Sequence, residues 1–166
     1  DLFLVDYANN LEDRLLINDG NRFFVDETET RMTAAMSESV FGTSAEIYDI
    51  NNDGFKDLIK VSSSGNAPPP GSTLPQVRII YNDGTGNFNS MMTYNKLKPY
   101  MMDLIDINKD GFLDIYVNRS YFNEDPERRR NLLFFNNRQS KTGSPCFRTC
   151  ILINKKLIIF NIVVVS

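Results

Sequence analysis

Residues 49–57 read DINNDGFKD, and residues 106–114 read DINKDGFLD, 57 positions further along the chain. An apolar run follows each stretch, at 58–61 and at 115–117. The chain opens in the same way, because Asp1 precedes the apolar run 2–5. Self-similarity at a fixed period is typical of repeat architectures. We therefore expect at least two copies of an acidic loop, with Asp1 as the last residue of a third, incomplete one.

A second element recurs between the acidic loops. Residues 14–24 read RLLINDGNRFF and residues 78–88 read RIIYNDGTGNF, while 131–137 (NLLFFNN) begin the same way and then lose the pattern. Asp-Gly between β-rich runs is a strong hairpin signal, because glycine adopts the positive φ of a tight turn. The central repeat is thus predicted to hold four strands, near 44–48, 58–62, 76–81 and 87–94.

Four antiparallel strands per repeat describe a β-propeller blade. A β-sandwich also has short strands joined by turns, but it does not require similar motifs at a 57-residue period. We predict an all-β chain and a partial β-propeller, with one complete four-stranded blade flanked by two incomplete blades. Repeats would occupy residues 1–137, with blade units breaking near 43 and 100. Residues 138–166 form a divergent tail that either completes the last blade or is foreign to it.

Propellers have about 4–8 blades. Four repeats of 57 residues would already exceed the 166 residues present. We therefore expect the remaining blades of the ring to lie outside this chain.

The acidic loops carry side-chain oxygens at positions 1, 3, 5 and 9, with glycine at position 6. Oxygen ligands of this number suit Ca²⁺, which takes 6–8 of them, and the carbonyl of position 7 can add one. The first predicted site consists of Asp49, Asn51, Asp53, Phe55 (carbonyl) and Asp57. The second consists of Asp106, Asn108, Asp110, Phe112 (carbonyl) and Asp114.

Two other interpretations of the loops fit the sequence less well. Ordinary Asp/Asn/Gly turns would account for one copy, but two near-identical copies make that explanation weaker. An EF-hand loop begins with the same spacing, yet it needs a glutamate at position 12 and flanking helices. Position 12 is Lys60 in one copy and Val117 in the other, and the flanks alternate like strands.

The pattern Asp-x-Asn-x-Asp-Gly-x-x-Asp before an apolar strand resembles the calcium loop of FG-GAP and VCBS repeats. Residues 40–45 (VFGTSA) are similar to the Phe-Gly segment that leads into the first strand of such a repeat. The Gly-Ala-Pro half of the second FG-GAP motif is missing, which favours the VCBS variety over the integrin one. The resemblance implies an extracellular or cell-surface location and a structural Ca²⁺ in a hairpin loop of each blade.

Composition excludes several other classes of function. The net charge is −3, so no basic footprint indicates nucleic-acid binding. Histidine is absent, which excludes a histidine-based triad. No apolar run reaches the roughly 18 residues of a membrane span, so we expect no membrane insertion by this segment.

We expect a non-enzymatic, calcium-binding propeller fragment for adhesion or for binding a protein or glycan ligand. The alternative is the propeller part of a secreted carbohydrate-active enzyme, such as a polysaccharide lyase. No nucleophile–base pair is recognisable in the sequence, which favours the first of these.

Overall fold

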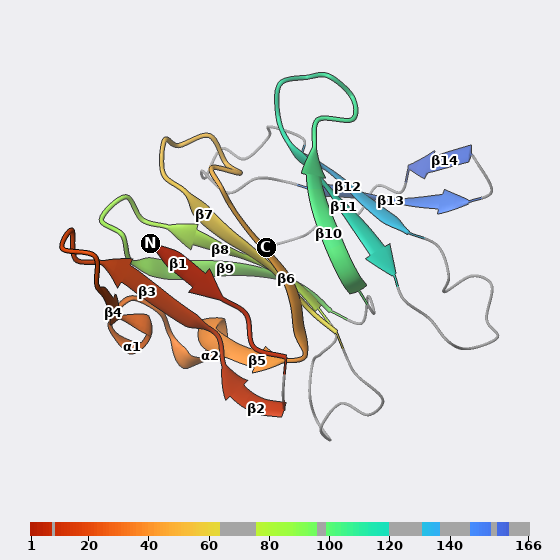
Figure 1. Cartoon of the computed structure of the whole chain (residues 1–166). Helices are drawn as coiled ribbons and strands as arrows, with labels where there is room; N and C mark the ends of the chain where they lie inside the picture. Colours follow the sequence, from red (N-terminus) through yellow and green to blue (C-terminus); the bar gives the residue numbers. More distant parts are fainter. Residues whose placement is uncertain are drawn as a thin grey trace.

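A computed structural model describes residues 1–7, 9–63, 76–95, 99–119, 131–136, 147–153 and 156–159 (Figure 1). Most of the segment 62–75 between the second and third expected strands, and parts of the tail 138–166, lie outside these residues. The described part is all-β apart from two short helices. The prediction of an all-β chain is confirmed.

The strands form three antiparallel sheets and one two-stranded ladder, and none of the sheets closes on itself in the described residues. We call them the N-terminal sheet (β1-β3-β4), the central sheet (β6-β7-β8-β9), the C-terminal sheet (β10-β11-β12-β13-β14) and the β2–β5 ladder.

The central sheet is an antiparallel meander in which each strand pairs with the next along the chain. Its strands are β6 (Gly42–Tyr48), β7 (Asp57–Ser62), β8 (Gln76–Asn82) and β9 (Phe88–Asn95). They coincide, within two residues at each end, with the four strands predicted for the central repeat.

The C-terminal sheet repeats this order. It contains β10 (Pro99–Ile105), β11 (Asp114–Arg119) and β12 (Leu132–Asn136), followed by β13 (Phe147–Ile153) and β14 (Lys156–Ile159). The last two strands come from the divergent tail, and β13 pairs directly with β12. The described part of the tail therefore extends the C-terminal sheet.

The N-terminal sheet is made of β1 (Leu2–Leu4), β3 (Arg14–Asn18) and β4 (Phe24–Asp26). The ladder joins β2 (Asn9–Glu12) to β5 (Glu38–Val40). Two helices that the sequence analysis did not foresee follow β4, α1 (Thr28–Arg31) and α2 (Ala34–Ser37). Met36 of α2 and Met32, which lies between the two helices, are buried in one cluster with Leu15 of β3.

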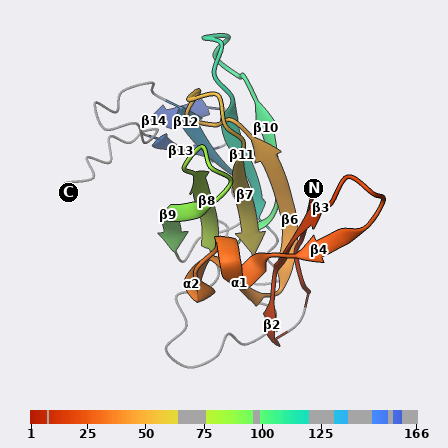
Figure 2. The same ribbon diagram turned by 90° about the vertical axis from the view of Figure 1, so that its left-hand side faces the viewer.

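The central sheet is covered on both faces (Figure 2). Ile59, Val61 and Ile79 pack against Met102, Ile115, Val117, Leu132 and Phe134 of the C-terminal sheet. On the other face, Leu58, Ile80 and Phe88 pack against Leu15, Met32 and Met36. All six residues of β7 are consequently buried, as expected for the middle layer of three stacked sheets.

A buried ion pair lies between the central sheet and the N-terminal region. Lys60, 1% exposed, donates a hydrogen bond to Asp13, which is fully buried, and a second to the Glu38 carbonyl at 2.8 Å. Arg78 also binds Glu38, at 3.0 Å to its carbonyl and 2.5 Å to its carboxylate. Burial lowers the pKa of Lys60 to about 8, although the Asp13 charge opposes that shift. Lys60, at the position where an EF-hand loop would have glutamate, thus joins the central sheet to the N-terminal region.

Replacing Lys60 by methionine should destabilise the protein by roughly 3–5 kcal/mol, because Asp13 would be left buried and charged without its cationic partner. The matched control is Arg14→Met, which breaks the exposed Arg14–Asp26 pair and should cost less than about 1 kcal/mol. Urea unfolding of both variants measures the difference. Equal losses of stability in the two variants would show that the buried pair does not hold these layers together.

Candidate metal centres

Both acidic loops occupy the same place in their sheets. The first joins β6 to β7, and the second joins β10 to β11. In each hairpin the last strand pair before the loop includes position 9, as Tyr48–Asp57 in one and Ile105–Asp114 in the other. The 57-residue repeat of the sequence is therefore a repeat in space, since equivalent loops lie between the first and second strands of successive sheets.

Side chains of the first loop fold its backbone into a tight curl. The Asp53 amide donates to Asp49 Oδ1 and to Asn51 Oδ1, each at 3.0 Å. The Gly54 amide donates to Asp49 Oδ2 at 2.9 Å, and the Phe55 amide to Asp53 Oδ1 at 2.9 Å. Gly54 has φ +95°, a left-handed conformation that side chains rarely adopt, which explains the glycine at position 6.

The second loop makes the same bonds. The Asp110 amide donates to Asp106 Oδ1 at 3.0 Å and to Asn108 Oδ1 at 3.1 Å. The Gly111 amide donates to Asp106 Oδ2 at 2.9 Å, and the Phe112 amide to Asp110 Oδ1 at 3.0 Å. Gly111 has φ +88°. The two acidic loops have the same residues at positions 1, 3, 5 and 6, and they adopt the same geometry.

The aspartate at position 9 closes each loop and is fully buried. Asp57 accepts the Ile50 amide at 3.1 Å and the Asn82 amide, at the end of β8, at 2.9 Å. Asp114 accepts the Ile107 and Asn136 amides at 3.0 and 2.9 Å.

Asp1 accepts the Asn18 amide at 2.9 Å, which is the equivalent bond in the N-terminal sheet. The structure thus places Asp1 where position 9 of an acidic loop lies.

The asparagines at the ends of β3, β8 and β12 are the partners that sequence reasoning missed; two of them begin Asn-Asp-Gly motifs. They were interpreted as turn residues, yet Asn18, Asn82 and Asn136 each present a backbone amide to the aspartate at position 9. An asparagine recurs at the end of β3, β8 and β12, each of which pairs with the strand that begins at or directly after an aspartate of position 9. That recurrence was the signal that could have shown the asparagine–aspartate bond.

The motif also forms a longer turn than a two-residue hairpin. Five residues separate β8 from β9, and five separate β3 from β4. Asn82 Oδ1 accepts the amides of Gly84 and Gly86, at 2.9 and 3.2 Å. The hairpin prediction is confirmed, and the asparagine side chain organises its five-residue loop.

Burial and neighbouring charge raise the proton affinity of the closing carboxylates. Burial is the main reason that the pKa of Asp57 rises to about 6, with smaller contributions from the charges of Asp53 and Asp49. The two backbone amides oppose the rise. The pKa of Asp114 is raised for the same reasons, with Asp110 and Asp106 as the neighbouring charges. In the first loop none of the three aspartates forms an ion pair within the described part of the chain.

The chemistry of each loop fits a hard divalent cation. Three carboxylates and an amide carbonyl gather in nine residues without a basic partner in the first loop, and carboxylate oxygens that accept one amide keep further lone pairs for a metal. The present arrangement is nevertheless not a closed cage. The Asn51 amide donates to Asp53 Oδ2 at 2.7 Å, and Asn108 makes the equivalent bond to Asp110 at 3.2 Å. Among the described residues no three acidic, histidine or cysteine side chains converge as a metal-holding group. A bound ion would require these two oxygens to exchange an amide for the metal.

Comparisons of the chain with protein-family models, with curated proteins and with solved structures give no match. In the described part of the chain, no helix is long and apolar enough to cross a membrane.

The Asp57 carboxyl should titrate near pH 6 in buffer containing EDTA. Its folded pKa lies above the ordinary value of 3.8, so the folded protein holds this proton when the unfolded chain has lost it. The contribution of Asp57 to stability should therefore fall as pH rises from about 4 to 6 and then level off. Carboxyl ¹³C NMR follows the titration directly, with the exposed Asp83, whose pKa is lowered by Thr85, as the internal control. A midpoint for Asp57 below that of Asp83 would contradict this account.

Proposed function

We propose that the chain is part of a calcium-stabilised β-propeller of the FG-GAP/VCBS kind, a non-enzymatic binding module that works outside the cell. The observation that carries this proposal is the double occurrence of one acidic loop geometry. Each copy joins the first two strands of a sheet, and each is closed by a buried aspartate bound to the third strand.

The order in which the sheets stack supports the propeller part of the proposal. Leu58, the residue after the first loop, faces the N-terminal sheet, and its equivalent Ile115 faces the central sheet. Each sheet therefore presents the same strand position to the sheet before it. Further sheets can be added to both ends of the stack by a head-to-tail contact of this kind. The stack closes into a ring when the rotations between neighbouring sheets add up to a full turn.

Apolar residues are exposed on the two outer sheets at positions that are buried in the central sheet. Leu2 is equivalent to Leu58 but is 43% exposed where Leu58 is 2% exposed. Ile107 is equivalent to Ile50 but is 41% exposed where Ile50 is 1% exposed. Residues that are core in the middle of the stack thus lie on its surface at both ends. Further blades outside this chain would cover both faces.

In this proposal Ca²⁺ is structural. When bound, the ion neutralises three carboxylates that otherwise repel one another, one of which is buried in each loop. The chain's own contribution is to hold the oxygens by the amides of positions 5, 6 and 7 and to anchor position 9 in the sheet. Because the ion binds the folded state, a concentration of about 100 times its dissociation constant would add roughly 2.7 kcal/mol per site.

Blades fixed in this way would present the surrounding loops to a protein or glycan ligand. The resemblance of the acidic loops to those of FG-GAP and VCBS repeats supports the extracellular location in this proposal.

Two Ca²⁺ should bind per chain, and Asp53→Ala or Asp110→Ala should each remove one of them. Each change deletes the side chain at position 5 while the other loop stays intact. Isothermal titration calorimetry gives the stoichiometry, and thermal unfolding with and without calcium gives the stabilisation.

Asp83→Ala is the matched control, because Asp83 also caps a loop through backbone amides but belongs to an Asn-Asp-Gly turn. This variant should still bind two ions. Unchanged stoichiometry in the position-5 variants would refute the calcium sites, whatever their stability.

A further inference from the structure

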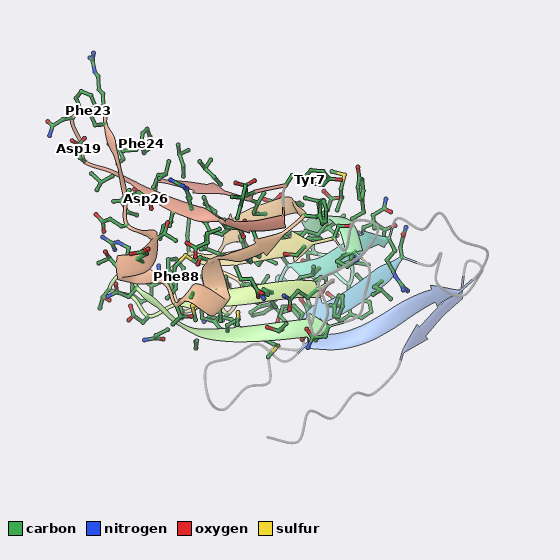
Figure 3. All side chains as sticks on the ribbon, turned by 90° about the horizontal axis from the view of Figure 1, so that it is seen from below. Tyr7, Asp19, Phe23, Phe24, Asp26 and Phe88 are labelled. Carbon is green, nitrogen blue, oxygen red and sulfur yellow. The ribbon has the colours of Figure 1, made fainter. Side chains whose placement is uncertain are left out.

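A cavity of about 380 Å³ opens between the N-terminal and central sheets at the end where the acidic loops lie. Its volume is in the range of small-molecule sites, roughly 300–1,000 Å³. In Figure 3 the β3–β4 hairpin rises away from the central sheet, with Phe23 and Phe24 at its tip, while Phe88 lies on the opposite side near the helices. The two layers thus separate toward this end instead of packing along their whole length.

The interior of the cavity is apolar. Its apolar lining consists of Leu15 and Ile17 of β3 with Leu58 and Phe88 of the central sheet, which pack together in one core cluster at its base. Ile47 pairs with Leu58 across β6 and β7 and is 42% exposed at the cavity mouth. The site therefore offers a hydrophobic slot whose mouth remains open to solvent.

The charged groups of the lining are few. Arg31 and Lys56 are the cations, and Asp1 is the one carboxylate. Arg31 is fixed by Glu27 at 2.5 Å and by the Gly86 carbonyl at 3.0 Å, which bridges α1 to the β8–β9 loop.

Gly86 has to be glycine here, because it has φ +88° and an added Cβ would meet the Arg31 guanidinium.

The backbone of Lys56 is hydrogen-bonded, whereas its side-chain ammonium group has no partner among the described residues. Asn82, another lining residue, donates to the Lys56 carbonyl at 3.1 Å. Within the described residues the Lys56 ammonium makes no hydrogen bond and no ion pair. Asp1, by contrast, already accepts the Asn18 amide. One cation at the mouth of an apolar slot thus lacks a counter-charge.

We infer that this cavity binds a small monocarboxylate, with its hydrocarbon part between the two sheets and its carboxylate on Lys56. Arg31 is already paired with Glu27, so Lys56 is the lining cation that is left to match a ligand with a single negative charge. The inference goes beyond the calcium-stabilised propeller: Lys56 is position 8 of the first acidic loop, but the apolar lining comes from the strands, so binding is tested without calcium.

Hexanoate is the probe, and 1-hexanol and hexylamine are its neutral and cationic counterparts. Titrations in EDTA, followed by ¹H–¹³C NMR, should shift the methyl signals of Ile17, Ile47 and Leu58 with hexanoate. Hexanol should bind more weakly and hexylamine most weakly. Lys56→Gln should weaken hexanoate binding roughly three- to tenfold and leave hexanol unchanged, since an exposed charge-assisted contact has about that value. Lys109→Gln, an exposed lysine in the other acidic loop, is the matched control and should have no effect.

A second variant tests the apolar part. Ile47→Trp places a larger side chain at the mouth and should reduce the binding of both hexanoate and hexanol. Because Ile47 is half-exposed, the fold should tolerate the change. The inference is overturned if hexanoate at millimolar concentration leaves these methyl signals in place, if hexanol binds as tightly as hexanoate, or if Lys109→Gln weakens binding as much as Lys56→Gln.

Discussion

The buried aspartate at position 9 of each acidic loop is the constraint on which the rest of the structure depends. Asp57 receives an amide from its own loop and an amide from the end of β8, so one carboxylate fixes the loop, the second strand and the third strand together. A buried carboxylate needs such partners, because its desolvation is costly. The same bonds at Asp114 set the second loop in an equivalent sheet.

Asn136 shows how successive sheets are joined through these loops. Its backbone amide binds Asp114, while its side-chain amide donates to the Ile50 carbonyl in the loop of the preceding sheet, at 2.9 Å. Ile50 itself packs into the core shared by the two sheets. The first acidic loop is thus part of the contact between the central and C-terminal sheets. On the other face of the central sheet, the Lys60–Asp13 pair joins this sheet to the N-terminal region.

Much of this arrangement could be predicted from the sequence, because it depends on local signals that repeat. The acidic loops, the four strands of the central sheet and the equivalence of Asp1 all follow from the 57-residue period. The Lys60–Asp13 pair could not be foreseen, since it joins residues 47 positions apart through the stacking of two sheets. Nor could the role of Asn136, whose partner Ile50 lies 86 positions away. The two short helices were missed because a long run of strand repeats favoured strands throughout.

The central claim is that the two acidic loops are built to hold a divalent ion. The most direct measurement is an X-ray structure of crystals grown with calcium, using the anomalous signal of the ion. The account predicts one peak in each loop, coordinated by side-chain oxygens of positions 1, 3, 5 and 9 and by the Phe55 or Phe112 carbonyl. Loops that contain water and keep the Asn51–Asp53 and Asn108–Asp110 bonds at saturating calcium would contradict it.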